Sequence, residues 1–402
     1  MLIRFYKDKY EDYFFLCMYL AWIKKKTEKH SRYKKSFYKS LQSIERARRN
    51  RHIPRPSLLS ADRSPWRKLY TSMNDSAMIT LTGLDIECFH WMCFKCKPYF
   101  DNYSPWLDDD TGNMVIRDKT RGRPRIISVE DCVGLNLAWT RTQGSLMSLQ
   151  LIFGLTYTHL STYVRYGRRI LIKVLKDEED SKVKIPSLSK IAQYQNAIFQ
   201  KYPMLDGVWC TMDGLKLNIE QSSDFIVQNR FYNGWTHGHY VSSVIVFCPD
   251  GTIPILCYNV PGCIHDSTIA EWGDIYHKLE SVYDTECKGK CTVDSAFCRK
   301  TNPFLIKSSQ SDPISDDPND LVINREATSM RQSAEWGMRG FQASFPRLKD
   351  KMKYEEGGER KKILKLSFLL YNLRARRVGI NQIRNVFMPS LERNVNDVVP
   401  IN

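Results

Sequence analysis

The stretch Val208-Trp-Cys-Thr-Met-Asp-Gly214 is the part of the sequence from which the fold can be read. Its apolar and β-branched residues predict a short buried strand that ends on the carboxylate of Asp213 and turns at Gly214. A second run of this kind, Lys290-Cys-Thr-Val-Asp294-Ser295, again places an aspartate at the end of a predicted strand. Because the ends of neighbouring strands meet at one edge of a sheet, we expect Asp213 and Asp294 to lie close together.

A third acid, Glu335, lies inside a predicted helix over Ala327–Phe345. Two strand-end aspartates followed by a helix glutamate, in that order, are what an RNase H-like nuclease needs. Hard divalent cations prefer carboxylate oxygens, and Mg²⁺ retains several waters, so few protein ligands suffice. Each acid alone is better explained as an ordinary strand end or a solvated helix residue. It is the ordered trio that favours a nuclease.

The composition is that of a folded protein with a polyanionic partner. The chain has 402 residues, 42% of them hydrophobic and 12% aromatic, which is enough for two or three domains. Lysine and arginine number 60 against 44 acids, and the net charge of +16 favours nucleic acid as the partner. No apolar run approaches the ~20 residues of a membrane span. The twelve scattered cysteines indicate the reduced thiols of an intracellular protein.

Basic residues of the N-terminal half predict DNA contacts. A basic, partly helical arm is expected over residues 1–56, with a solvated tail as an equal alternative. Arg121-Gly-Arg-Pro-Arg125 then closes a helical or mixed segment over residues 57–126. This run resembles the AT-hook core, which lies in the narrow minor groove of A·T DNA. Arg121, Arg123 and Arg125 are therefore candidate DNA contacts, the alternative being a basic loop that leads into the next helix.

The next region, residues 127–186, has the spacing of a helix-turn-helix. A capping box at Ser128 opens a helix to about Thr140, and two further helices are predicted over Leu146–Phe153 and Thr156–Leu175. The alternative is a helical hairpin with a basic exposed face. The third helix carries the basic residues that we expect to contact DNA, which are Arg165, Arg168, Arg169 and Lys173. The polar segment Lys176–Lys190 predicts a linker, so this region and the last domain are expected to fold separately.

The last domain, residues 187–390, is predicted to be mixed α/β, and residues 391–402 form a tail. Two antiparallel strands, Tyr240–Cys248 and Ile253–Val260, follow the strand of Asp213. A helix from Asp266 to about Val282, the strand of Asp294, a loop over Ser308–Asp320 and the helix of Glu335 complete the order. Three meandering strands, a helix, a strand and a helix with the third acid are typical of an RNase H-like domain, a mixed sheet flanked by helices.

Five short motifs in this domain are similar to those of one family. They are Asp213-Gly214, Tyr232-Asn-Gly-Trp235, Pro261-Gly-x-x-His-Asp-Ser267, Val293-Asp-Ser-Ala-Phe297 and Arg331-x-x-x-Glu335-x-Gly337. From about Val208 to Asn385 the chain resembles the PIF/Harbinger-type DDE transposases, of the class called DDE superfamily endonucleases. The resemblance implies a nuclear, metal-dependent recombinase that cuts and joins double-stranded DNA at transposon ends. It also implies a Myb-like DNA-binding accessory protein and a homo-oligomer on DNA.

In that reading Asp213, Asp294 and Glu335 are catalytic and hold two Mg²⁺ (or Mn²⁺) ions about 3.5–4 Å apart. His265 and Asp266 follow the Pro-Gly turn, where they are candidates for a phosphate contact and a further metal ligand. For Asp266 the alternative is an ordinary helix N-cap. The rival function is that of a domesticated, non-catalytic DNA-binding or scaffold protein derived from a transposase. The intact acid trio speaks against the rival.

Overall fold

The structure is a computed structural model that describes residues 53–108, 113–117, 125–297, 302–307, 318–354 and 356–388. The chain divides into two compact units, Met1–Ile53 and Pro54–Asn402, and the second unit is described below. Several predicted features lie outside the described residues: nearly all of the basic arm, Arg121 and Arg123, most of the loop after Ser308, and the C-terminal tail.

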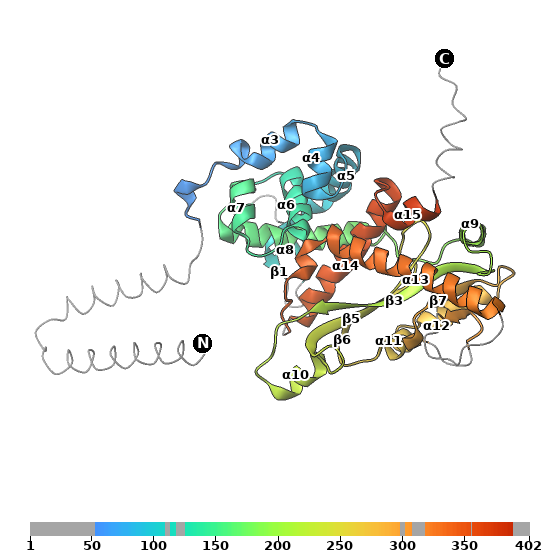
Figure 1. Cartoon of the computed structure of the whole chain (residues 1–402). Coiled ribbons are helices and arrows are strands. Elements are labelled where there is room, and N and C mark those ends of the chain that lie inside the picture. The colour runs from blue at the N-terminus through green and yellow to red at the C-terminus, as the bar shows by residue number, and fades with distance from the viewer. Residues whose placement is uncertain are drawn as a thin grey trace, which may run out of the picture. The chain divides into compact units, whose positions relative to one another are not determined.

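The first part of the second unit is helical (Figure 1). The three helices predicted after Ser128 are confirmed, and the capping box between Ser128 and Asp131 is present. Trp66 is fully buried beneath them, donates to Asp131 Oδ1 at 2.9 Å and stacks on Phe153. The elements are η1 (Arg55–Ser57), η2 (Ala61–Arg63), α3 (Pro65–Thr71), α4 (Asp75–Thr82), α5 (Ile86–Asn102), β1 (Tyr103–Asp108), β2 (Met114–Ile116), α6 (Val129–Arg141), α7 (Met147–Phe153) and α8 (Tyr157–Leu175).

The second part is built on a mixed sheet in the order β4-β5-β3-β7-β8, with β6 also paired to β5. Strand β3 is antiparallel to β5 and parallel to β7, which is parallel to β8. The predicted antiparallel strands after Asp213 are confirmed, although β6 begins at Leu256 and not at Ile253. The strands are β3 (Val208–Asn218), β4 (Tyr232–Asn233), β5 (Gly238–Phe247), β6 (Leu256–Pro261), β7 (Lys290–Val293) and β8 (Leu305–Lys307).

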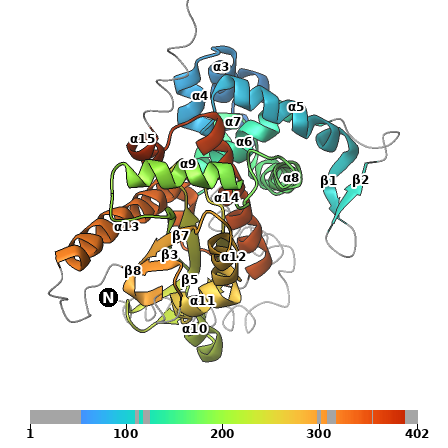
Figure 2. The ribbon, with the colours of Figure 1, turned by 90° about the vertical axis from the view of Figure 1, so that its right-hand side faces the viewer.

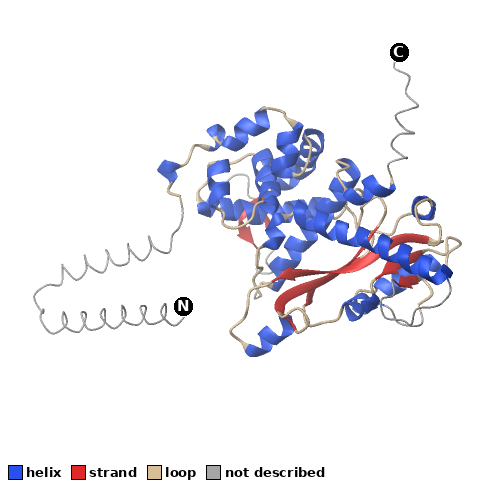
Figure 3. Ribbon diagram, in the orientation of Figure 1, coloured by secondary structure: helices blue, strands red, loops and turns tan. Residues whose placement is uncertain are grey.

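Helices flank this sheet on both sides (Figures 2 and 3). The helix predicted from Asp266 to Val282 is two helices, because Asp274 adopts a left-handed conformation (φ 59°) that interrupts it. Among the described residues, none of the helices has both the length and the apolar character needed to cross a bilayer. The elements are α9 (Leu188–Phe199), α10 (Phe225–Phe231), α11 (Asp266–Trp272), α12 (Ile275–Tyr283), η3 (Ser295–Phe297), α13 (Pro318–Ser344), η4 (Pro346–Lys349), α14 (Gly357–Arg377) and α15 (Gln382–Phe387).

The segment Lys176–Lys190 is not the free linker that its polar composition predicts. Ser181 is buried, Arg376 Nη1 of α14 donates to the carbonyl of Asp180 at 2.7 Å, and Asn372 Nδ2 donates to the carbonyl of Lys182 at 3.1 Å. The segment therefore satisfies its backbone groups on a helix of the sheet region and not in water. The predicted division at residue 187 is not seen, since the chain from Pro54 onward forms one compact unit.

Candidate active site

Asp213 lies in the middle of β3 and not at its end. The strand continues to Asn218 because Leu215 and Leu217 alternate as buried residues, and β5 pairs with it from Thr211 to Asn218. The predicted turn at Gly214 is therefore wrong. The Asp213 side chain is 16% exposed, and its Oδ1 accepts from the backbone N–H of Gly214 at 2.7 Å. A carboxylate is thus held almost out of water inside a strand.

Asp294 directly follows β7, as predicted. Strands β3 and β7 are parallel, with Met212 opposite Val293, so the residues that come next in each strand are Asp213 and Asp294. The Ser295 backbone N–H donates to Asp294 Oδ1 at 2.7 Å, which repeats the arrangement at Asp213. The register therefore brings the two aspartates onto adjacent strands.

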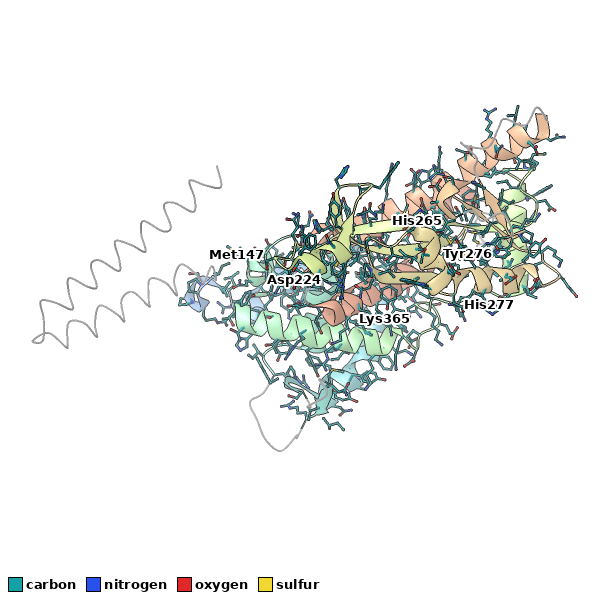
Figure 4. All side chains as sticks on the ribbon, turned by 90° about the horizontal axis from the view of Figure 1, so that it is seen from below. Met147, Asp224, His265, Tyr276, His277 and Lys365 are labelled. Carbon is teal, nitrogen blue, oxygen red and sulfur yellow. The ribbon has the colours of Figure 1, made fainter. Side chains whose placement is uncertain are left out.

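Asp266 is the first residue of α11, and the N-cap is His265, whose Nδ1 accepts from the Ser267 N–H at 3.4 Å. The cap explanation for Asp266 is therefore wrong. His265 is exposed at this helix end (Figure 4). The Asp266 carboxylate instead lies against β3, where a Cβ built on Gly214 would come within 2.7 Å of its Cγ. Only glycine at position 214 leaves room for this approach.

Burial and neighbouring like charges raise the pKa values of Asp213 and Asp266. Burial raises the pKa of Asp213 to about 6, and the charges of Asp294 and Asp266 add to the rise, while the Gly214 N–H and Arg331 oppose it. Burial also raises the pKa of Asp266, to which the charge of Asp294 contributes, and Lys216 and His265 oppose that change. Like charges gathered in a poorly solvated place are typical of a functional site.

Glu335 reaches this cluster through an arginine. It lies on α13, where Arg331 Nη1 is 3.4 Å from Glu335 Oε1 and Arg339 Nη2 is 3.8 Å from Glu335 Oε2. The same Arg331 Nη1 is 4.0 Å from Asp213 Oδ2. Arg331 is therefore a cation between the helix glutamate and the strand aspartate.

The donor chemistry of these residues fits a hard divalent cation, because every candidate ligand is a carboxylate oxygen. The carboxylates are not gathered into one set: within the part of the chain that the structure describes, no three His, Cys, Asp or Glu residues form a group that could hold a metal ion. Glu335 is engaged by its two arginines. Asp213 and Asp294 are the first candidates to bind such a cation, with Asp266 beside them.

Residues 212–372 match the family model described as DDE superfamily endonuclease. The match supports this superfamily. The matched range includes the four acids and leaves out helices α3 to α8. DDE superfamily endonucleases use divalent metals, in keeping with the carboxylate donors found here. No curated protein and no solved structure matches the chain.

Outside the matched range 212–372, several of the predicted DNA contacts have partners within the protein. Arg168 is 7% exposed, is paired with Glu359 of α14 and lies over the Trp139 ring. Arg125 donates to the carbonyl of Tyr103 at 2.8 Å, and its guanidinium lies 4.2 Å from the Phe100 ring centroid.

Lys173 Nζ donates to the Tyr103 hydroxyl at 2.8 Å. The burial of Arg168 argues against a DNA contact by this residue. Arg125 and Lys173 are half-buried and have internal partners, and their contacts to DNA stay a prediction. Arg165 is exposed on α8 and Arg169 is half-buried.

Two residues of the matched range have roles that the sequence analysis did not assign. Arg331 stands four residues before Glu335, a spacing that places both on one face of a helix, so its pairing with Glu335 could have been anticipated. Its second contact, to Asp213, depends on how α13 crosses β3 and has no sequence signal. Gly214 was assigned to a turn, whereas it admits the Asp266 carboxylate.

Proposed function

We propose that the chain is a metal-dependent DNA endonuclease of the transposase type, which cuts and joins DNA at transposon ends. The observation that carries the proposal is the placement of Asp213 and Asp294 on adjacent parallel strands, with Asp266 against the first of them. The superfamily match over the same residues supports nuclease chemistry in general.

An RNase H-like fold is part of the proposal. It is supported by the order of elements: three meandering antiparallel strands, two short helices, a parallel strand that leads to Asp294, and a long helix with Glu335. The five motifs quoted above support the narrower assignment to the PIF/Harbinger type.

The chemistry follows from the acids. Asp213, Asp294 and Glu335 would hold the divalent cations, Mg²⁺ or Mn²⁺, with Asp266 as a further ligand. When bound, two such cations supply an activated oxygen nucleophile and stabilise the charge on the leaving oxygen. The backbone N–H of Gly214 donates to one carboxylate oxygen of Asp213, and that of Ser295 donates to one carboxylate oxygen of Asp294. These hydrogen bonds orient the other oxygen of each carboxylate. His265, exposed beside Asp266, is placed for contact with a phosphate of the DNA.

DNA binding, a nuclear location, a homo-oligomer on DNA and a Myb-like accessory protein belong to the same proposal. The net charge of +16 supports a polyanionic partner. The exposed Arg165 of α8 is the first candidate for a phosphate contact among the described residues of the predicted helix-turn-helix.

The test is nicking of supercoiled DNA by the purified chain with Mg²⁺ or Mn²⁺, alone and with a Myb-like partner. Asp294→Asn should lower the nicking rate by about 10³-fold or more, the scale seen when a central catalytic group is removed. Asp284→Asn is the matched control, because Asp284 is exposed at the end of α12 and should leave the rate unchanged. Equal rates for wild type and Asp294→Asn would contradict the proposal. DNA binding without metal-dependent nicking would favour the non-catalytic alternative.

A further inference from the structure

Arg331 differs from an ordinary helix-surface arginine in what surrounds it. Its side chain is 23% exposed and touches acids from two elements, Asp213 of β3 and Glu335 of α13. Arg339 stands at the mirror position, four residues after Glu335, but its side chain is 78% exposed, and within the described part of the chain its ion-pair partner is Glu335. The two arginines have the same spacing from Glu335 and differ in their access to the aspartate cluster.

The contacts of Arg331 are loose. Its Nη1 lies 3.4 Å from Glu335 Oε1 and 4.0 Å from Asp213 Oδ2, and its buried Nε has no hydrogen-bond partner among the residues that the structure describes. A charge-assisted hydrogen bond to a carboxylate is typically about 2.7–2.9 Å long. The guanidinium is therefore held by the field of the acids and not by a close bidentate fit, so a competing cation can displace it.

The surrounding charges are unequal. Asp213, Asp266, Asp294 and Glu335 are the acids of this site, whereas Lys216 and His265 face Asp266 and Arg339 faces Glu335 from the solvent side. Arg331 is the cation that contacts both Asp213 and Glu335. It takes the place, between a strand acid and the helix acid, that the proposed function gives to a divalent cation.

We propose that Arg331 is a resident counter-cation of the acid site, which stabilises the metal-free chain and competes with the divalent cation for Asp213 and Glu335. The inference rests on the proposed function and concerns how its site is loaded. Arg331 acts through the acids, and it is a positioning residue: it keeps Glu335 beside Asp213 until a metal replaces it.

The alternative is a simple helix pair. A surface arginine at i−4 to a glutamate contributes only about 0.3–0.5 kcal/mol and has no reason to oppose metal binding. Under that alternative Arg331→Gln and Arg339→Gln should behave alike. Under the proposal only Arg331→Gln should change the metal affinity.

The experiment uses the full chain and Mn²⁺ alone, with binding followed by electron paramagnetic resonance or calorimetry. Arg331→Gln should bind Mn²⁺ about tenfold more tightly, since even a screened charge at 4 Å from a carboxylate contributes on this scale. In EDTA the same variant should melt at a lower temperature than wild type, and adding Mn²⁺ should abolish this difference in melting temperature. Arg339→Gln should change the affinity by less than about twofold. Arg331→Lys, which keeps the charge, should bind like wild type.

Unchanged or weaker Mn²⁺ binding by Arg331→Gln would overturn the inference while leaving the proposed function intact. If wild type binds no more Mn²⁺ than Asp294→Asn does, the proposed metal site fails and the inference fails with it. Should Arg331→Gln be unfolded in EDTA, circular dichroism must show that Mn²⁺ refolds it, and a chain that stays unfolded counts against the inference.

Discussion

The charged residues near α8 and the acids around Asp213 of β3 have opposite electrostatic surroundings. On α8, Arg168 is paired with Glu359 and covered by the Trp139 ring. Nearby, Arg125 is bonded to a carbonyl and an aromatic face. At the sheet, Asp213 has like charges beside it, and a single loosely placed arginine opposes them.

The difference indicates which buried charges stabilise the fold and which are candidates to bind a ligand. A buried charge that is paired stabilises its surroundings only while the pair stays intact, and its contacts are made to groups of the protein and not to a ligand. A cluster of like charges destabilises the chain that contains it, and a bound cation removes that destabilisation. Charge alone therefore says little about role until the internal partners of each side chain are known.

The largest effect on folding is expected at Arg168. Arg168→Met should lower the free energy of unfolding by about 3 kcal/mol, because it removes the buried guanidinium that pairs with Glu359 and lies over the Trp139 ring, while Lys362 remains as the second partner of Glu359. Urea denaturation measures this loss. The DNA affinity of the folded variant should equal that of wild type, as the side chain is not accessible. A drop in DNA affinity with no loss of stability would show that Arg168 belongs to a binding surface after all.

Removing the charge of Asp213 should raise the free energy of unfolding, whereas removing the charge of Arg168 lowers it. Its pKa of about 6 in the folded chain lies above the ordinary value of 3.8, so the unfolded chain loses this proton first as the pH rises. The metal-free protein therefore loses stability between about pH 4 and pH 6, by up to about 3 kcal/mol.

Asp213→Asn removes this titration. In EDTA at pH 7.5 the variant should be more stable than wild type by about 1–3 kcal/mol, and the difference should vanish near pH 4. Urea denaturation across this pH range is the measurement. A variant that is less stable than wild type at pH 7.5 would mean that ionised Asp213 is stabilising, contrary to the contrast drawn here.

The smallest effect is expected at Arg165, which is exposed on the same helix as Arg168. Arg165→Ala should change stability by less than about 0.5 kcal/mol. It should reduce the salt dependence of duplex binding by about one unit of slope, the contribution of one phosphate contact. Binding titrations at several salt concentrations test this. An unchanged slope would remove α8 from the DNA-contacting surface.

Local patterns predicted much of this molecule. The capping box at Ser128 and the strand that leads to Asp294 both follow from periodicity and capping, which act over a few residues. These features do not depend on distant parts of the chain.

The errors share a different cause. Each of the three mispredicted features depends on a partner far away in sequence. The continuation of β3 past Gly214 depends on β5, the position of Asp266 depends on β3, and the internal pairing of Arg168 depends on Glu359. A glycine after an aspartate is typical of a turn, and a basic helix face is typical of a DNA contact. In this chain tertiary packing overrides both of these local patterns.

The way α14 holds the segment Lys176–Lys190 has a consequence for exchanging parts between proteins. Asn372 and Arg376 bond to the carbonyls of Lys182 and Asp180, so the helices before this segment and the sheet after it share one interface. A chimera joined within the segment would set α14 against a foreign backbone. The unit that can be transplanted with its contacts intact therefore runs from the first helices through α14.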